Sequence, residues 1–550
     1  MKKAGTERTG AIMAMLALAS MILAGRAAAS TYVVYIPVDD PIYDELDSLN
    51  ALGALDSYLP EIRPISRVEA ARLVLEAESN LARAQSTDAL AREMVDTLSA
   101  QLALEIGWLE GNEEDRLPSM VRPVQRLQLN YIYSSGARRE FYVQTGAFTK
   151  VREATPLLSG NSDLPTASGN NEAAIWEGWA GVGGFLSAYG EGAFAGPLRS
   201  DHNSPDRDRI VSGGVVVSLG NVALSFGNEQ MEWGIGHYSQ LSQSANASAF
   251  AALRLQNVHP SHLPSFLRYL GLMRWQAFFG QLDSARTFSR PWIDGQIVSF
   301  KPLPNFDFGF SHTIDFGGSG NDNYGLAGFL GRASGFATGN PIGANTNSRF
   351  SVFARMRFPS LRYTQFYGEI LGEDFYQPFG HKSGPKLPFK APSYQVGIYL
   401  PRLTRDGLTD ARLEWTLLDR QYSVHNDSLY WTYDGRLMGD PLGPRAQRIE
   451  LGLGRWFDLR YKLAMDLYYE LRQPTSTNIG TINERAEGVA FELLRLPVKL
   501  RRLDGAMGDL QVRVGFEYVG NENFTQHNSL RTLLNISIGL SPRNGAITWR

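Results

Sequence analysis

The sequence predicts an all-β protein, a transmembrane antiparallel β-barrel of about 18 strands preceded by a small α-helical module. Three observations predict this class. Apolar and polar residues alternate over most of the chain, the N-terminus resembles an export signal, and no later apolar run reaches the roughly 18 residues of a spanning helix. Alternation keeps the mean hydropathy low, because only every second residue of such a strand faces lipid.

The composition of the 550-residue chain excludes several classes of function. Hydrophobic residues make up 43% and charged residues 20%, which is enough apolar material for a folded core. The chain has no cysteine, so disulfides, thiolate metal sites and cysteine nucleophiles are ruled out. A net charge of −3 provides no basic footprint, and we therefore expect no nucleic-acid partner. No metal, cofactor or catalytic group is predicted, since His259 and His262 lie in a proline-flanked loop without further ligands.

Residues 1–29 have the layout of a cleavable signal peptide. Basic residues precede the apolar stretch 11–24, and the alanines at 27–29 offer a small-residue cleavage site. We therefore expect export and, with the barrel, a place in the cell outer membrane.

Residues 30–115 are predicted to form the small helical module. Asp39 or Asp40 can cap a helix that begins at Pro41, after which leucines recur every three residues. The run from Ser66 to Glu69 has capping-box spacing for a second helix. A third helix is expected from about residue 87 to residue 107.

Part of this module resembles half of an S-layer-homology module. The resemblance is carried by "YDELDSLNALGAL" and, after a proline-containing link, by "ISRVEAARLVLEA". Modules of that family bind cell-wall polymers, so the resemblance implies peptidoglycan as a partner. The competing interpretation, which we favour, is a helical plug or lid that packs on the following domain.

Residues 116–550 are predicted to form the outer-membrane β-barrel. From residue 460 to 471, for example, leucines and tyrosines occupy one face, whereas Lys462, Asp466 and Glu470 occupy the other. A soluble β-sandwich would also alternate, but strands of about 10 residues exceed the usual length in globular sheets. Charges of both signs on the polar face fit a wet or plugged lumen. Outer-membrane lipid is the expected surroundings, because only a closed barrel leaves no strand edge unpaired in lipid.

Short and long connections alternate in the C-terminal half. The long ones are predicted at about 315–348, 373–392, 422–446 and 472–484, facing outward if the last strand ends in the periplasm. The same alternation fails in the N-terminal half. This failure indicates one missed or one extra strand, most simply near residues 110–125 or 245–255.

Two motifs resemble the Wzi family of capsule-assembly outer-membrane proteins. "NEQMEWGIGHYSQLSQSANAS" at 228–248 is similar to the family's Trp-Gly-x-Gly segment, and "MGDPLGPRAQRIELGLG" at 438–454 is similar to its Gly-x-Pro-Leu-Gly-Pro turn. Glu232 and Ile235 depart from the first pattern, where the family often has tryptophan and proline. The resemblance implies an outer-membrane lectin that binds or anchors capsular polysaccharide or exopolysaccharide at the cell surface and supports capsule assembly. The family resemblance implies no catalytic residue.

One predicted outward loop is dense in side chains that suit sugar recognition. Sugars need apolar ring faces for packing and planar polar groups for their hydroxyls. Aromatic residues of a membrane-interface girdle would give part of the same pattern. The predicted polysaccharide-binding residues are Asn426, Asp427, Tyr430, Trp431, Tyr433, Asp434 and Arg436.

A second group of residues, Glu232, Trp233, Gly234 and Gly236, is predicted to form a constriction inside the barrel, with ligand contact as the alternative.

The rival function is a sugar- or solute-selective outer-membrane porin. An open lumen with a charged constriction would favour the porin. A lumen packed by arginine–carboxylate pairs and by the helical module would favour the lectin.

Overall fold

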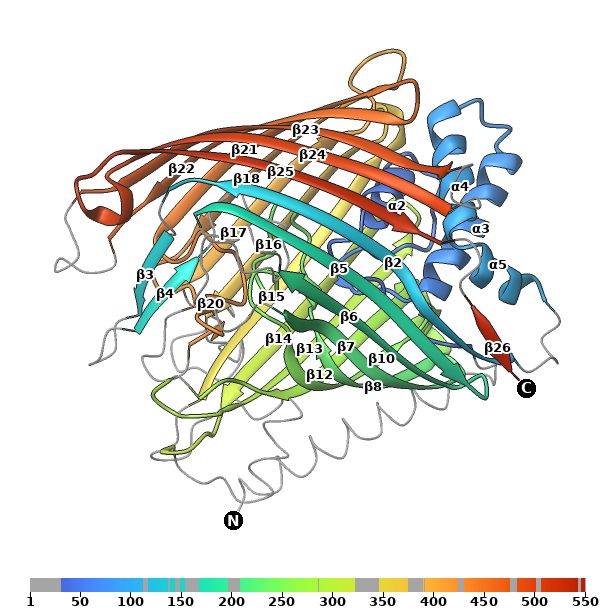
Figure 1. The fold of residues 1–550 in the computed structure, drawn as a ribbon, viewed down its shortest axis with the longest axis horizontal. Helices are drawn as coiled ribbons and strands as arrows, with labels where there is room; N and C mark the ends of the chain where they lie inside the picture. Colours follow the sequence, from blue (N-terminus) through green and yellow to red (C-terminus); the bar gives the residue numbers. More distant parts are fainter. Residues whose placement is uncertain are drawn as a thin grey trace.

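The computed structural model shows a closed barrel with a group of helices at one end (Figure 1). The structure describes residues 31–111, 117–136, 139–143, 149–153, 168–195, 208–284, 286–321, 346–373, 389, 391–423, 430–474, 482–500, 506–542 and 546–549.

The barrel wall contains 18 long antiparallel strands, each paired with the wall strands before and after it in the chain. The first and last of them, β2 and β25, pair with each other and close the ring. No wall strand is therefore left with an unpaired edge, which confirms the predicted fold class. The wall strands are β2 (Ser119–Ser134), β5 (Gly169–Val182), β6 (Leu186–Ala195), β7 (Asp208–Leu219), β8 (Val222–Glu229), β10 (Phe250–Asn257), β12 (Leu272–Gln281), β13 (Trp292–Leu303), β14 (Phe306–Phe316), β15 (Thr346–Phe358), β16 (Thr364–Glu373), β17 (Pro392–Leu400), β18 (Thr409–Leu418), β21 (Ala446–Phe457), β22 (Tyr461–Arg472), β23 (Glu484–Leu500), β24 (Ala506–Gly520) and β25 (Ser529–Ser541).

The two faces of the wall follow the alternation of the sequence. On β22, Leu463 and Leu467 are exposed on the outside, whereas Glu470 is buried on the inside. Phe226 on β8 is 63% exposed although it is fully apolar. Such a continuous apolar exterior is stable only against lipid.

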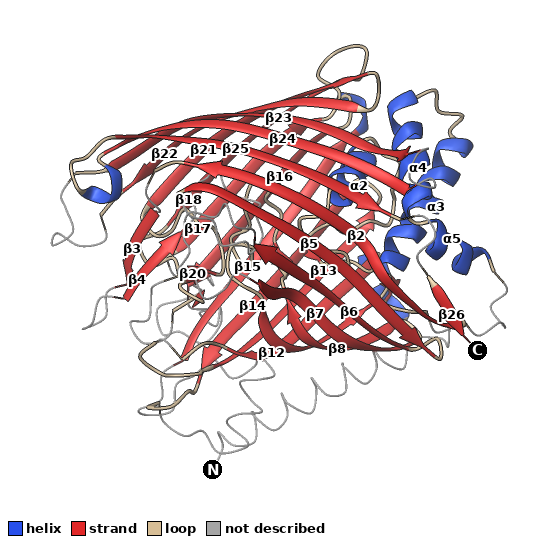
Figure 2. Ribbon diagram, in the orientation of Figure 1, coloured by secondary structure: helices blue, strands red, loops and turns tan. Residues whose placement is uncertain are grey.

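The short elements lie in the connections or inside the barrel. Two-residue strands form small ladders, and three short helical turns lie in loops (Figure 2). They are β1 (Ile62–Arg63), β9 (Glu232–Trp233), β11 (Ser261–His262), β19 (Thr432–Tyr433), β20 (Arg436–Leu437), β26 (Ile547–Trp549), η2 (Ser265–Leu270), η3 (Pro359–Leu361) and η5 (Glu522–Phe524).

The helical module has four described helices, α2 (Ile42–Ala51), α3 (Arg67–Arg83), α4 (Ala89–Gln101) and α5 (Ala103–Glu110). The predicted cap of the second helix is present, because Ser66 accepts a hydrogen bond from the Glu69 N–H. The first helix begins at Ile42, one residue later than predicted; Pro41 is its N-cap, and Asp40 accepts from the Ile42 N–H. The single third helix expected at 87–107 is wrong, because the backbone leaves helical geometry at Leu102 and begins α5. None of these described helices combines the length and the apolar content that crossing a membrane requires.

The two ends of the barrel differ. One end has the short turns, such as residues 220–221 between β7 and β8, together with the helical module and β26 near the C-terminus (Figure 1). The other end has the long connections, including the four that the sequence predicts. Outer-membrane barrels have short periplasmic turns and long outer loops, so we name these the periplasmic and the outer end.

The irregularity of the N-terminal half has another origin than the one predicted. Residues 119–134 and 250–257 are ordinary wall strands. The extra strands are β3 (Arg139–Val143) and β4 (Thr149–Glu153), which pair with each other inside the long 135–168 connection. Their alternation resembles that of the wall because successive side chains of any strand point to opposite faces.

Candidate functional site

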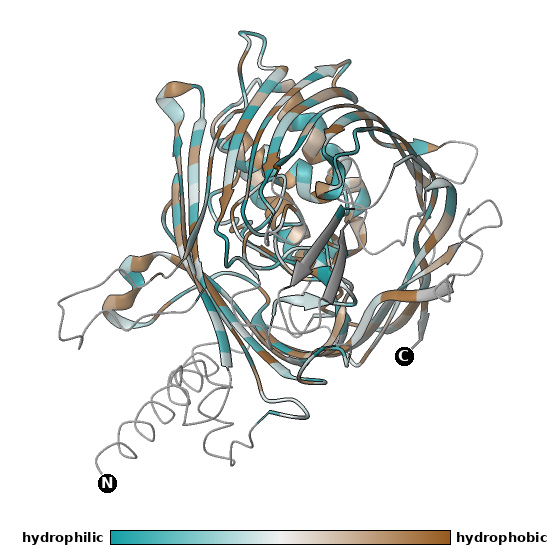
Figure 3. Cartoon of the chain, turned by 90° about the vertical axis from the view of Figure 1, so that its left-hand side faces the viewer, coloured by the Kyte–Doolittle hydropathy of each residue, from teal (hydrophilic) through white to brown (hydrophobic). Residues whose placement is uncertain are grey.

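Three segments fill the lumen. The first is the helical module: Figure 1 places α2 near the periplasmic end, and Figure 3 shows helices within the ring of strands. The second is the inward segment, residues 230–249, which connects β8 to β10. The third is the outer loop, residues 419–445, which connects β18 to β21.

The inward segment and the module join through backbone pairing. Ile62 of β1 lies opposite Trp233 of β9, and the Gly234 N–H donates to the carbonyl of Glu61. Trp233 is fully buried, and its indole N–H donates to the Gln276 side chain of the wall. Arg63 of the module forms ion pairs with Asp47 at 2.7 Å and with Glu232 at 3.5 Å.

The two glycines of the Trp-Gly-x-Gly motif permit close approach to the wall. A β-carbon on Gly236 would lie 2.0 Å from the carbonyl oxygen of Ser239 and 2.4 Å from the Gln395 side chain. Gly234 has φ of +142°, a conformation that residues with a side chain rarely adopt. The motif therefore lies inside the barrel and fixes the path of the inward segment.

The outer loop bends into the lumen and bonds to the inward segment. The Tyr422 hydroxyl donates to the carbonyl of Leu241, and Ser244 donates to the carbonyls of Met438 and Gly439. The bonds of Ser244 connect the two family-like motifs, and Ser244 and Gly439 are 195 residues apart in the sequence.

The predicted saccharide-binding residues of the outer loop divide into three groups. Asn426 and Asp427 lie outside the described residues. Tyr430 and Trp431 are buried rather than displayed on an exposed tip. Asp434 is exposed and accepts from the Ser248 hydroxyl, whereas Tyr433 and Arg436 are partly buried.

The burial of Trp431 has a clear physical reason. Its indole N–H donates to Glu373 at 3.1 Å, and the Arg349 guanidinium lies 4.3 Å from the ring centroid. Arg349 in turn donates to the carbonyl of Ser242 in the inward segment. Trp431 therefore holds the outer loop in the lumen, and its ring faces are covered by protein.

The wall around these segments carries many ion pairs. Arg448 lies 3.3 Å from both Asp440 and Glu450. Arg531 contacts Glu517 at 2.8 Å and Glu522 at 2.6 Å, with all three side chains buried. Buried pairs of this kind add little net stability, but breaking one leaves an uncompensated charge. They therefore favour one arrangement of the lumen.

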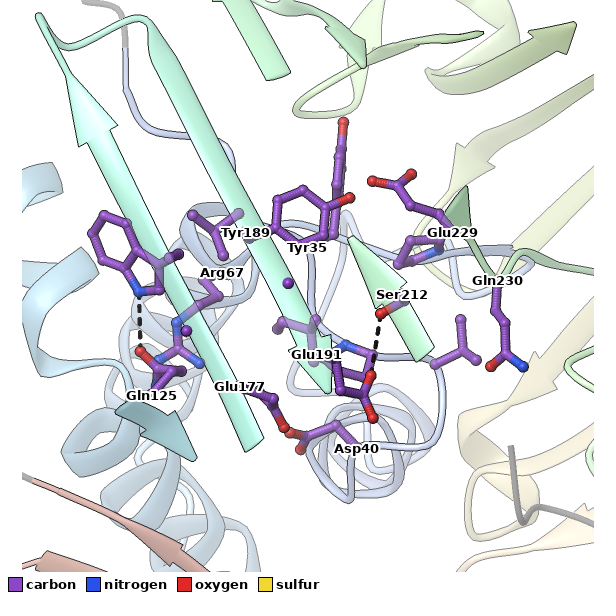
Figure 4. Close-up of a pocket in the computed structure, with 18 residues that line it drawn as sticks. Tyr35, Asp40, Arg67, Gln125, Glu177, Tyr189, Glu191, Ser212, Glu229 and Gln230 are labelled. Carbon is purple, nitrogen blue, oxygen red and sulfur yellow. Dashed lines mark hydrogen bonds between the residues drawn. The ribbon is translucent and has the colours of Figure 1, made fainter. Parts of the chain in front are cut away.

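The space that remains is unequal on the two sides of the lumen. Between the module and strands β5 to β8 the cavity is only about 40 Å³ (Figure 4). There Trp179 donates to Gln125, Ser212 donates to Glu191, and the rings of Tyr35 and Tyr189 meet edge to face.

On the opposite side, facing strands β17 to β25, a cavity of about 380 Å³ remains. Its lining combines ion pairs of the wall with aromatic side chains, and it reaches from α2 to Arg436 of the outer loop. Its lining includes His237, Tyr238, Tyr399, Arg412, Arg436 and Lys462. Sequence reasoning singled out Arg436, and His237 as a neighbour of the motif glycines with ligand contact as the second interpretation; it missed the others, because they are single residues on strands or in the inward segment.

A family model described as capsule assembly protein Wzi matches residues 141–530. The chain belongs to the Wzi family. The match covers more than two thirds of the chain and confirms the family that the two motifs resemble. It does not include the N-terminal module, whose S-layer-homology resemblance has no support in these comparisons.

Solved structures agree with the fold of this Wzi-family barrel. Wzi from Escherichia coli, described as an outer-membrane protein involved in group 1 capsule assembly and as a carbohydrate-binding β-barrel, is 15% identical. The similarity covers 94% of this chain and 99% of that one, with a TM-score of 0.63. OprD from Pseudomonas aeruginosa is more distant, at 9% identity over 77% of this chain and 95% of that one, with a TM-score of 0.43. Curated protein sequences gave no match. The family and the closed barrel together make this chain an outer-membrane protein.

Proposed function

We propose that this barrel binds capsular polysaccharide or exopolysaccharide at the cell surface and so supports capsule assembly. The observation that carries the proposal is the filled lumen of a Wzi-family barrel, closed by the module, the inward segment and the outer loop. A filled lumen supports binding rather than passage of solutes. The Escherichia coli relative, described as carbohydrate-binding, supports the same function.

The polymer contacts that we propose are on the hairpin of β19 and β20. Asp434 is exposed and Tyr433 and Arg436 are partly accessible, so their carboxylate, ring and guanidinium groups can meet a sugar. Charge-assisted hydrogen bonds contribute about 1.5–3 kcal/mol each, and a long polymer repeats them. We assign Tyr430 and Trp431 a supporting role, because a covered ring face cannot stack on a sugar.

The test compares two double variants in cells that make the polymer. D434A/R436A should lower cell-bound polysaccharide severalfold and release it into the medium without reducing its synthesis. D406A/R455A is the matched control, because it removes an exposed ion pair of the same charges from a periplasmic turn. Equal retention by both variants, displayed at wild-type levels, would exclude the β19–β20 hairpin.

The porin alternative is tested by conductance in a planar bilayer. We expect the intact protein to conduct far less than a general porin, since three segments fill its lumen. Large currents would instead favour solute transport. Peptidoglycan binding by the module remains a prediction, and pull-down of the full chain by isolated cell wall tests it.

A further inference from the structure

Two of the cations that line the larger cavity, Arg412 and Arg436, form no ion pair among the described residues, and Arg436 instead donates to the backbone carbonyl of Asn246 at 3.5 Å. Arg63, Lys462 and Arg513 line the same space, and each lies within 4 Å of at least one carboxylate. The guanidinium of Arg412 donates one hydrogen bond, to the Tyr367 hydroxyl at 3.3 Å, and lies 4.0 Å from the ring centroid of Tyr399.

Arg412 is also placed where a ligand could reach it. It lines both the 380 Å³ cavity and an adjoining one of about 80 Å³, which the motif glycines Gly234 and Gly236 also line. A guanidinium has five N–H donors, so most of those on Arg412 remain available. Other arginines without a carboxylate, such as Arg274 and Arg357, donate instead to backbone carbonyls of the module.

One neighbour of Arg412 in the cavity is a histidine that stays neutral. Burial and then Arg412 itself, followed by Lys462, hold the pKa of the neighbouring His237 well below its usual value. His237 therefore stays neutral and does not compete with Arg412 for an anion. Carboxylates outnumber cations along the rest of the lining, so a ligand carboxylate would be accommodated at Arg412 rather than elsewhere in the cavity.

The remaining lining has the chemistry of a sugar site. Tyr238 is partly exposed and provides apolar ring surface, while Gln240, Asn246 and Gln511 provide amides for hydroxyl groups. A cavity of about 380 Å³ is within the usual range for small-molecule sites. One carboxylate can pair with Arg412, and sugar hydroxyls can donate to the acidic side chains.

We propose that this lumenal cavity binds an acidic sugar, a saccharide unit whose carboxylate pairs with the guanidinium of Arg412. The inference rests on the proposed function for the class of ligand, and it adds a second site inside the barrel, centred on Arg412 of β18, although Arg436 of the β19–β20 hairpin also lines the cavity. The hairpin holds polymer at the surface, and the lumenal site selects units that carry a carboxylate.

The test titrates the full mature protein in detergent with glucuronate, glucose and acetate, measured by calorimetry. Glucuronate should bind at millimolar concentration or better, and glucose and acetate each at least tenfold more weakly, because each has only part of the recognised chemistry. R412Q should weaken glucuronate binding at least tenfold and leave the weak glucose signal unchanged. R412K should retain an intermediate affinity, since lysine keeps the charge but not the planar fork.

Two controls keep the proposal falsifiable. R455Q removes an arginine at the periplasmic end of β21, outside the cavity lining, and this variant should bind glucuronate like the wild type. Heat-modifiable gel mobility verifies that each variant is folded, and if R412Q fails this check, added salt must still weaken wild-type glucuronate binding more than glucose binding. The proposal is overturned by equal binding of glucuronate and glucose, by acetate that binds as well as glucuronate, or by wild-type affinity in folded R412Q. Absence of glucuronate binding with normal polymer retention in cells overturns only the lumenal site, whereas equal retention by D434A/R436A and by its control D406A/R455A overturns the surface assignment.

Discussion

The two sides of the lumen have the same wall geometry but different contents. Along β5 to β8 the module is attached to the wall by side chains that bond to its backbone: Ser187 donates to the carbonyl of Val33, and Ser218 donates to that of Thr31. Rings of Tyr32, Trp108 and Trp179 pack in the same region. Along β17 to β25 the wall's charged residues pair mainly with one another, as Lys462 does with Asp410.

This difference explains how one barrel can have an occupied lumen and still keep a cavity in which a ligand can bind. On the packed side the wall uses the module as its core. On the open side the wall satisfies its own charges, so a volume beside the module can remain hydrated without leaving buried charges unpaired. Attachment and binding are therefore assigned to different strands.

The comparison predicts its largest effect when the module is removed. Deleting residues 30–115 while keeping the signal peptide should leave a barrel that assembles, because the strand hydrogen bonds close within the sheet. Conductance in a planar bilayer should then rise about tenfold or more, as expected for an 18-stranded barrel that has lost its largest plug. Unchanged conductance would mean that the inward segment and the outer loop alone close the lumen.

Larger side chains in the wall should destabilise the module on the packed side more than on the open side, and we expect this effect to be smaller than that of deleting the module. A β-carbon on Gly181 of the packed side would lie 2.7 Å from the Tyr32 ring, so G181L should destabilise the seated module by about 1–3 kcal/mol. Ala464 lines the open cavity, and A464L should change stability by less than about 0.5 kcal/mol. Limited proteolysis of the module, measured against denaturant, gives both values. Equal effects would contradict the division into a packed and an open side.

The smallest predicted effect concerns pH. Burial, and then nearby carboxylates beginning with Asp40, raise the pKa of Glu45 in α2 well above its usual value. The folded module therefore keeps a proton that the unfolded chain loses above about pH 4.5, and the stability contributed by this group falls as pH rises toward the folded pKa. E45Q should reduce the loss of module stability between pH 5 and pH 8, measured by proteolysis, whereas E78Q at an exposed position of α3 should not. A wild-type slope in E45Q would show that Glu45 is ionised in the folded module.

The sequence predicted the wall well because lipid and lumen impose a strict period of two. The alternation of β22 and the long connections in the C-terminal half follow directly from that period. The hairpin of β3 and β4 was not separable from the wall, since strand alternation does not reveal the partner strand. The break at Leu102 was also invisible, because the residues on both sides of it favour helix.

The candidate site was predictable only in part. The aromatic and charged composition of the outer loop pointed to a special segment, but composition cannot distinguish a ring displayed to solvent from one buried against Arg349 and Glu373. Arg412 was missed because an arginine on the polar face of a strand resembles its many paired neighbours. Only the three-dimensional arrangement shows which of these cations lack a carboxylate.

The attachment of the module to many strands has a consequence for biogenesis. Asn50 accepts from Lys301 of β13 and from Arg357 of β15, and the apolar core of the module includes Trp456 of β21 and Leu496 of β23. Residues that leave the ribosome first thus depend on partners made hundreds of residues later. During transit through the periplasm the barrel strands that contact the module are not yet assembled. We therefore expect the module to expose apolar side chains at this stage and to need periplasmic chaperones. The part of the chain that is synthesised first is the part whose native contacts are completed last.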